Sequence, residues 1–303
     1  MTDRPLQTTY RPRQPLDLRA TVGGLQRGPG DPTQQAVRGV IWRAVRTGAG
    51  VATLALAQQS DGSVRAAAWG SGASRALAQV PALCGALDDA AGFDAGRHPL
   101  IADAHRRLPG LRLARTDAVF EAFAQAVIEQ KVTVRQAFGA WRRLVSWHGE
   151  RAPGPTPRPL FAPPEPSSWR RMPSWTLHRA GLEPPQSRTL VHAAARADAV
   201  ERAARAATDP DPLVSLPGVG PWTAAETRIR ALGDPDAVSV GDFHLAHQVG
   251  YALTGSRTDD AGMLELLEPW RGHRQRAIRL LLAAAPREPR RAPRLHAEDH
   301  RAR

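Results

Sequence analysis

The stretch that decides the fold of this chain is LPGVGPWTA, which occupies residues 216–224. It separates two segments with helical patterns, and the second of them extends from Pro221 to Leu232. Gly218 and Gly220 allow the chain to reverse direction tightly, because glycine adopts positive φ at little cost. Proline suits the first turn of a helix, so several backbone N–H groups face outward beside a helix N-terminus. Such a turn can bind a phosphate, and an ordinary helical hairpin punctuated by glycines is the alternative.

A second marked stretch, VSVGDFHL, occupies residues 238–245 and places Asp242 twenty residues after Trp222. Asp242 follows a short apolar run and precedes another helical segment, Phe243 to Leu253. Aspartate is a common helix N-cap, and that role alone would account for this residue. The hairpin and the aspartate at this spacing together form a more specific pattern than either feature alone.

Together these two stretches resemble the helix-hairpin-helix DNA glycosylases, and most closely the DNA-3-methyladenine glycosylase II family of alkylation repair. The resemblance covers about residues 16–285 and includes the segment VIEQKVT at residues 127–133. It implies an α+β fold. In that fold a TATA-binding-protein-like α/β domain precedes an all-helical pair of subdomains, and the active site lies between the subdomains.

The resemblance also implies roles for individual residues. Asp242 is the expected catalytic acid, and Trp222 and Glu226 are expected to line the base pocket. The residues expected to bind DNA are Gly218, Val219, Gly220 and Thr223 of the hairpin, with Gln130 and Lys131. In the family the hairpin can hold a monovalent cation through backbone carbonyls when DNA is bound. No other metal and no cofactor are expected.

The chemistry of these residue types fits base excision. An alkylated purine such as 3-methyladenine is cationic, so its glycosidic bond is already weakened. Once the nucleotide is flipped out of the duplex, the indole of Trp222 can hold the cationic base by cation–π attraction. The carboxylate of Asp242 can stabilise an oxocarbenium-like transition state, or orient and deprotonate water. The expected activity is excision of alkylated purines from double-stranded DNA in base excision repair.

Two further residues place the chain within the superfamily. Bifunctional relatives cleave the DNA backbone through a lysine Schiff base, and that lysine sits two residues after the second hairpin glycine. Trp222 occupies this position here, while the single lysine, Lys131, lies about ninety residues upstream. A lyase activity is therefore not expected. The single cysteine, Cys84, excludes a disulfide framework and the four-cysteine iron–sulfur cluster of the endonuclease III branch.

Three positions depart from the family pattern. Lys131 stands where relatives often carry an apolar wedge that fills the gap left by the flipped base, and a solvated residue is the alternative. Glu226 shares a helix face with Trp222, where relatives carry an aromatic residue. It could attract a cationic base or form an ion pair with Arg230. The last helix also lacks the pocket aromatic expected near Arg279.

These departures keep two other functions open. One is a glycosylase for oxidised or deaminated bases, whose pocket would depend less on cation–π contact. The other is a non-catalytic helix-hairpin-helix protein that binds DNA without releasing a base. The presence of Asp242 at the family spacing favours an enzyme.

The composition agrees with a partner that is a polyanion. Lys and Arg number 41 against 29 Asp and Glu, a formal net charge of +12, although GC-rich codons alone could produce many of the arginines. No apolar run approaches the ~18 residues that a membrane span needs. The first residues form no apolar secretory signal. We therefore expect a monomeric, cytoplasmic and nucleoid-associated protein that contacts no membrane.

The pattern along the chain predicts four parts. These are a flexible N-terminal segment over residues 1–15, a mixed α/β domain over 16–94, a helical region over 95–285 and a flexible basic tail over 286–303. Strands are expected at 37–42 and 51–56, and helices at 74–87, 134–147, 186–207 and 278–285. A further helix around Val119 is expected to have Thr116 as its N-cap and Asp117 in its first turn. Trp169 and Trp175 are expected in the core, and Asp88 as a solvated or capping acid.

Overall fold

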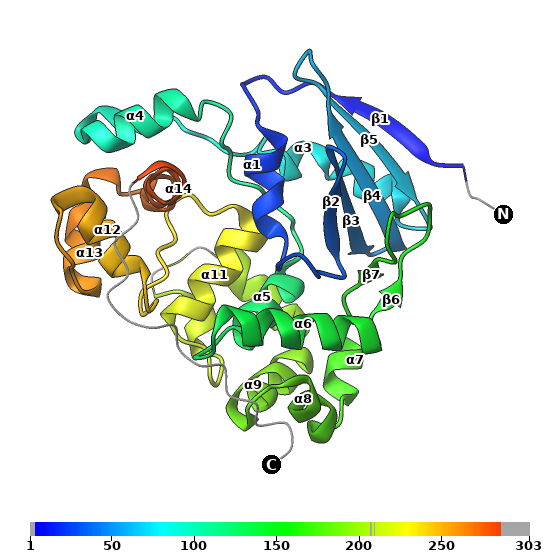
Figure 1. Cartoon of the computed structure of the whole chain (residues 1–303). Helices are drawn as coiled ribbons and strands as arrows, with labels where there is room; N and C mark the ends of the chain where they lie inside the picture. The colour runs from blue at the N-terminus through cyan, green and yellow to red at the C-terminus, as the bar shows by residue number, and fades with distance from the viewer. Residues whose placement is uncertain (1–3, 207, 209, 286–303) are drawn as a thin grey trace.

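The computed structural model of the chain describes residues 4–206, 208 and 210–285, so the expected basic tail at 286–303 lies outside the described residues. Figure 1 shows a sheet on one side of the molecule and two groups of helices packed beside it. The α+β class expected from the sequence is confirmed. Within the described residues, no helix combines the length and the apolar character that crossing a bilayer requires.

The sheet has five antiparallel strands in the order β1-β5-β4-β3-β2. The strands are β1 (Leu6–Tyr10), β2 (Gln34–Val37), β3 (Val40–Thr47), β4 (Gly50–Gln58) and β5 (Val64–Trp69). One face packs on α1 (Leu18–Val22), α2 (Ala73–Ala78) and α3 (Val80–Leu83). The opposite face is partly covered by the short pair β6 (Glu150–Arg151) and β7 (Phe161–Ala162).

The structure corrects three expectations for this domain. The segment expected to be flexible contributes β1, because its Thr and Tyr residues favour a strand and the edge of β5 offers unpaired backbone groups. The strand expected at 37–42 is split, since Arg38 and Gly39 have φ of 49° and 79° and form a two-residue hairpin turn. The helix expected at 74–87 breaks near Gln79, where Pro81 removes a backbone donor.

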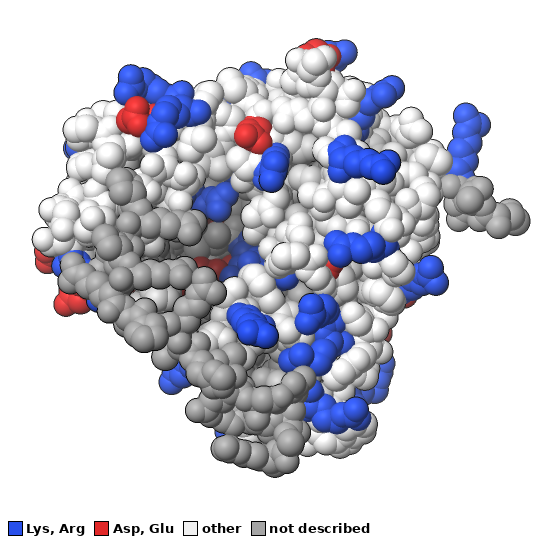
Figure 2. Space-filling model, in the orientation of Figure 1, with Lys and Arg blue, Asp and Glu red and all other residues white. Residues whose placement is uncertain are grey.

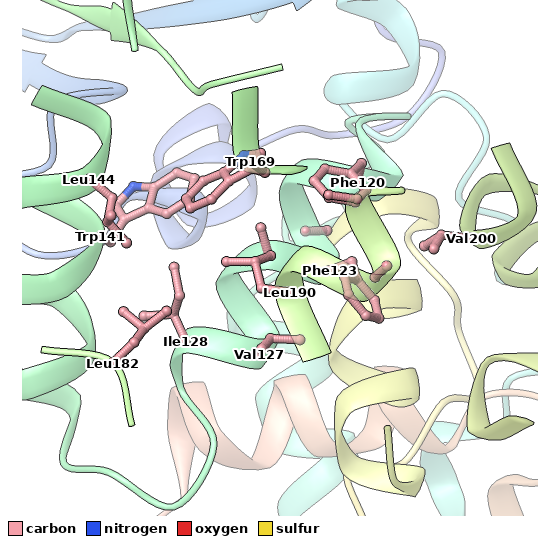
Figure 3. Packing of buried hydrophobic residues seen from close by; sticks show 14 of the residues in the cluster. Phe120, Phe123, Val127, Ile128, Trp141, Leu144, Trp169, Leu182, Leu190 and Val200 are labelled. Carbon is pink, nitrogen blue, oxygen red and sulfur yellow. The ribbon is translucent and has the colours of Figure 1, made fainter. Parts of the chain in front are cut away.

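The first helical group forms the largest core of the molecule. It comprises α5 (Val119–Ile128), α6 (Val134–His148), α7 (Pro166–Arg171), α8 (Ser174–Ala180), α9 (Pro184–Ala194), α10 (Ala197–Arg205) and α11 (Pro221–Leu232). Figure 3 shows Trp141, Trp169 and Leu190, from three different helices of this group, gathered in this core with Phe120 and Phe123 of α5. Trp169 is buried as expected, whereas the expectation for Trp175 is wrong because its side chain is 60% exposed.

Two helix boundaries in this group differ from the sequence patterns. The helix α5 has Ala118 as its N-cap, without a side-chain bond, because Thr116 donates its hydroxyl to the carbonyl of Arg230. Asp117 lies outside the helix with φ of 54° and pairs with Arg205. The long helix expected at 186–207 is two helices, α9 and α10, separated by a turn at residues 195–196.

The second helical group combines elements from distant parts of the chain. Its helices are α4 (Pro99–Arg107), α12 (Leu245–Thr254), α13 (Asp260–Leu267) and α14 (Arg274–Ala284), with the 3₁₀ turns η2 (Ala95–Arg97) and η4 (Glu268–Trp270). Although α4 precedes α5 in sequence, it packs on α14 and contributes Ile101 to the core of this group. The chain therefore contributes α4 to this group first, then forms the first helical group, and afterwards supplies α12, α13 and α14 to this group.

A buried ion pair fastens the sheet domain to α14. Asp88 directs Oδ1 and Oδ2 at Nη2 and Nη1 of Arg276, at 2.5 and 3.1 Å. The exposed fractions of the two side chains are only 1% and 7%. Asp88 also accepts the backbone N–H of Leu113. The expectation of a solvated or capping acid is therefore wrong for Asp88.

We expect Asp88→Ala to lower the free energy of unfolding by about 3–5 kcal/mol, because it leaves the buried guanidinium of Arg276 without its counter-charge. The matched control is Asp89→Ala, since Asp89 is exposed and bonds only a neighbouring N–H by its side chain. The control should cost about 1 kcal/mol or less. Urea unfolding curves measure both values. Equal losses for the two variants would contradict the role of the ion pair.

Candidate active site

The glycine-rich hairpin lies between η3 (Pro212–Ser215) and α11. Gly218 has φ of 79°, and a Cβ at this residue would collide with Oγ1 of Thr189. Gly220 has φ of −104° and open space around it, so only the first glycine is required by the backbone. Pro221 starts α11 as expected, and the bonds of the helix begin with the N–H of Ala224 on the carbonyl of Gly220, so the N–H groups of Trp222 and Thr223 lie before that ladder. The geometry provides a surface of backbone donors suited to a phosphate.

The side chains of Val219 and Thr223 face inward. Val219 is 8% exposed within the first helical core, and its N–H bonds the carbonyl of Leu216. Thr223 is 2% exposed and accepts a hydrogen bond at Oγ1 from Gln130. These two residues, expected to bind DNA, can therefore offer only their backbone to a ligand, while their side chains shape the hairpin.

Gln130 connects the hairpin to the turn between α5 and α6. Its Nε2 donates to the carbonyl of Gly218 at 3.0 Å and to Oγ1 of Thr223 at 2.8 Å. The next residue, Lys131, is exposed and has φ of 54°, an uncommon conformation for a residue with a side chain. The cap of α6 by Thr133 and Gln136 follows directly. The structure thus brings Lys131 beside the hairpin through a rigidly bonded neighbour.

Trp222 and Asp242 are in direct contact. The indole Nε1 of Trp222 donates to Oδ2 of Asp242 at 3.0 Å. Oδ1 of the same carboxylate accepts the N–H groups of His244 and Leu245, each at 2.9 Å. Asp242 therefore accepts two N–H groups at the start of α12 from outside the helix, because α12 begins at Leu245 rather than at Phe243 and its N-cap residue is His244. Three donors fix the plane of a carboxylate that is only half-buried.

The segment that leads to Asp242 is anchored by Ser239. Ser239 is 3% exposed, and its hydroxyl donates to Oε1 of Glu226 at 2.6 Å. Its carbonyl accepts the N–H of Asp242 at 3.2 Å. Gly241, with φ of 88°, then lets the chain turn toward α12. Ser239 therefore links the carboxylate of Glu226 to the backbone of Asp242 and helps to fix the position of that residue.

A cluster of ion pairs surrounds Glu226. Nη2 of Arg230 lies 2.6 Å from Oε2 of Glu226 and 2.5 Å from Oε2 of Glu129. Arg27 of the sheet domain approaches Glu129 at 3.9 Å and donates from Nε to Gln125 at 3.2 Å. The ion-pair alternative considered for Glu226 is the one observed. Of the residues in this cluster, sequence reasoning missed Arg27 and Glu129.

Burial and charge act differently on the two arginines. Burial, followed by repulsion from Arg230, lowers the pKa of Arg27 to about 10. Burial also opposes the charge of Arg230, but the carboxylates of Glu226 and Glu129 outweigh it and raise the pKa of Arg230. Both guanidinium groups are protonated at neutral pH. The two positive charges therefore balance the two negative charges in this cluster.

Figure 2 shows a hollow near the centre of the face seen in Figure 1, with basic and acidic atoms at its floor. The hollow lies over the place where α1, α11 and α14 meet. Arg279 of α14, near which an aromatic residue was expected, donates to the carbonyl of Ala20 in α1. Phe243, next to Asp242, is 73% exposed, and the sequence analysis did not identify it as a site residue. Its position directly after the candidate catalytic residue could have identified it.

The described residues contain no group of three or more His, Cys, Asp or Glu side chains placed to hold a metal ion. His247, for example, is turned toward the carbonyl of Thr258. The hairpin carbonyls of Leu216, Gly218 and Gly220 each accept one hydrogen bond, from Val219, Gln130 and Ala224. A carbonyl oxygen has a second lone pair, so the expected monovalent cation site stays a prediction.

A scan against protein-family models and a search of curated proteins gave no match. Solved structures do match. The 3-methyladenine DNA glycosylase of Archaeoglobus fulgidus superposes with a TM-score of 0.76 at 16% identity, over 91% of this chain and 97% of that chain. The 8-oxoguanine glycosylase/lyase of Clostridium acetobutylicum gives a TM-score of 0.71 at 13% identity, over 94% and 99%. Its complex with double-stranded DNA gives 0.70 at 13%, over 92% and 96%. These likenesses show a shared fold.

We expect Arg230→Met to destabilise the fold by about 3–5 kcal/mol at pH 7, because Glu129 and Glu226 lose their shared partner. Burial and mutual repulsion then raise the pKa of these carboxyl groups above the unfolded value of about 4.3. A raised acid pKa adds stability at low pH that is lost as the pH rises through the folded pKa. The loss of unfolding free energy caused by Arg230→Met should therefore be smaller at pH 5 than at pH 7.

The control for this prediction is Glu226→Gln, which keeps the Arg230–Glu129 pair and an oxygen that can accept the hydroxyl of Ser239. Its loss of stability should be smaller and nearly the same at both pH values. Urea unfolding at pH 5 and pH 7 measures the three proteins. If the loss of unfolding free energy in Arg230→Met does not change with pH, Arg230 stabilises the fold by its packing rather than by its charge.

Proposed function

From its shared fold with the helix-hairpin-helix DNA glycosylases, we propose that this chain is a DNA glycosylase that hydrolyses the N-glycosidic bond of damaged purines. The preferred substrates are alkylated purines of the 3-methyladenine type, and the setting is base excision repair. The observation that carries the proposal is the carboxylate of Asp242, which is held by Trp222 and two backbone N–H groups beside the glycine-rich hairpin.

The fixed carboxylate suits the reaction because the sugar develops positive charge as the base departs. Oδ1 of Asp242 is engaged by two backbone donors, so the orientation of the group is set before substrate binds. Oδ2 is engaged by the indole N–H of Trp222 and faces the side where the base pocket is expected. An oriented carboxylate stabilises the oxocarbenium-like transition state without reorganisation, and it can also accept a proton from attacking water.

Binding of the duplex is assigned to the hairpin and the turn before α6. In this proposal the backbone N–H groups at the start of α11 bind a phosphate of the DNA backbone. Gln130 holds the hairpin against the turn between α5 and α6. Lys131 extends from that turn, where its stem can fill the space left by a flipped nucleotide while its ammonium pairs with a phosphate. Lys131 is exposed and has φ of 54°, in a turn that belongs to neither helix.

The enzyme is proposed to lack lyase activity. A Schiff base requires an amine beside the reacting sugar, and Trp222 occupies the position where bifunctional relatives carry that amine. The single lysine of the chain, Lys131, lies in the turn between α5 and α6, whereas Trp222 contacts Asp242 directly. The product is therefore an abasic site in an intact strand.

A second substrate class is favoured by the ion pairs of Glu226. A free carboxylate at this position would attract a cationic base, but Arg230 neutralises it. The attraction of a cationic base then rests on aromatic faces such as that of Trp222 rather than on a free carboxylate. Neutral lesions, such as deaminated or oxidised purines, are the second candidate substrates for this reason.

Other features of the proposal follow the resemblance and stay predictions. They are the TATA-binding-protein-like character of the sheet domain, a boundary of that domain near residue 94, a monomeric state and a location with the nucleoid. A non-catalytic DNA-binding protein would share the hairpin and the charge. The fixed position of Asp242 supports the enzyme.

We expect Asp242→Asn to retain the fold and duplex binding while lowering the rate of base release by roughly 10²-fold or more, because an amide cannot supply charge to the developing cation. The side-chain oxygen of asparagine can still accept hydrogen bonds from the two backbone N–H groups at the start of α12. Mass spectrometry of bases freed from methylated duplex under single-turnover conditions measures the rate.

The control is Asp260→Asn, since Asp260 accepts the N–H of Gly241 in the same region but does not touch Trp222. This variant should release base at a rate within a few-fold of the wild type. Near-wild-type release by Asp242→Asn would leave Asp242 as a helix cap only, and the proposed mechanism would then be wrong.

A further inference from the structure

The surface formed by α6, α7 and α8 carries half of the net charge of the chain. Residues 134–180 contain eight arginines and two glutamates, a net charge of +6 against +12 for all 303 residues. Both acids are engaged, because Glu150 pairs with Arg46 and Glu165 accepts the hydroxyl of Ser167. Figure 2 shows basic groups gathered over this region with little acidic surface between them.

Two tryptophans are exposed within this basic surface. Trp147, near the end of α6, is 48% exposed, and Trp175, at the start of α8, is 60% exposed. The guanidinium of Arg179 lies 5.9 Å from the ring centroid of Trp147. Trp175 and Arg179 are four residues apart on α8, so their side chains are neighbours on one helix face. Arg179 therefore stands between two indoles.

Three arginines of this surface have no acidic partner among the described residues. No carboxylate there forms an ion pair with Arg170, Arg171 or Arg179, and residues 166–180 contain no acid at all. Arg143 donates from Nε and Nη2 to the carbonyl of Ala180, at 3.0 and 2.7 Å, and so fixes α8 against α6. The indoles and the charges therefore belong to one rigid platform.

The platform is separate from the candidate active site. Lys131 precedes the first residue of α6, and Trp147 is close to its last. A helix rises 1.5 Å per residue, so about 20 Å of helix lies between the two. A base that lies beside Lys131 therefore cannot at the same time lie on Trp147.

We propose that the surface of Trp147, Trp175, Arg179 and Arg171 is a second nucleic-acid site, and that its ligand is single-stranded DNA. Arginines on a surface without acids attract a phosphate backbone. Exposed indoles offer faces on which unpaired bases stack without regard to sequence, and neighbouring guanidinium groups add to that stacking. Paired bases in a duplex have no free faces, so the indoles select the single strand.

The test measures binding of the full chain to a fluorescein-labelled dT20 strand and to a lesion-free 20-base-pair duplex by anisotropy. Trp175→Ala should raise the Kd for dT20 about tenfold and leave the Kd for the duplex within about twofold. Trp175→Phe should retain most of the affinity, because an aromatic face remains. Arg179→Glu should weaken dT20 binding and reduce its dependence on salt.

Two controls separate stacking from charge alone. Arg65→Glu makes the same charge change at an exposed arginine of β5, and it should affect dT20 binding less than twofold. A 20-mer of abasic residues keeps the phosphates but lacks bases. It should bind at least tenfold more weakly than dT20 and should not respond to Trp175→Ala.

Several results would overturn the proposal. They are unchanged dT20 binding by Trp175→Ala and Arg179→Glu, equal binding of dT20 and the abasic strand, and equal weakening of duplex and single strand. Competition by polyglutamate as strong as by unlabelled dT20 would indicate an acidic protein partner instead. Tighter binding of rU20 than of dT20 would indicate RNA. None of these measurements depends on base release, so the site can be tested whether or not the proposed enzymatic activity is found.

Discussion

The buried guanidinium of Arg230 connects the parts of the chain that make up the candidate site. It bonds Glu129, which adjoins the turn carrying Gln130 and Lys131, and it bonds Glu226 on the helix that follows the hairpin. Glu226 in turn accepts the hydroxyl of Ser239, whose carbonyl holds the N–H of Asp242. The turn that carries Lys131, the helix that follows the hairpin and the segment that leads to Asp242 therefore share one charged centre. Burial of that centre is tolerable only because positive and negative groups balance within it.

The balance has a consequence for the base pocket. Glu226 was expected to meet a cationic base, but it is committed to Arg230 and Ser239, so its main effect is on the position of Asp242. The indole N–H of Trp222 orients that carboxylate. Under the proposed function, the face of the same indole would hold the flipped base. Selectivity among damaged purines would then depend on Trp222 and on the balance of charge around Glu226, rather than on a free carboxylate.

Local patterns could be predicted from the sequence, and the long-range ones could not. The hairpin, the start and end of α11 and the hydrogen bonds of Asp242 at the start of α12 depend on glycine, proline and aspartate acting over a few residues. In the ion-pair cluster, only Glu226 and Arg230 are related by a local pattern, the i, i+4 spacing on one helix. Arg27, Glu129 and the hydrogen-bonded Ser239 join them from distant positions that no local pattern relates. Trp175 was misplaced because α8 is a short helix that buries only the stripe of Thr176, Leu177 and Ala180.

The central claim is that the chain releases a damaged base by hydrolysis and leaves the strand intact. The most direct measurement incubates the wild-type protein with methylated duplex and follows free bases by mass spectrometry and strand length by denaturing gel, with and without borohydride. We predict free 3-methyladenine, full-length strands until alkali is added, and no borohydride-trapped adduct. Tight duplex binding without release of any methylated, deaminated or oxidised base would contradict it, as would a trapped covalent complex.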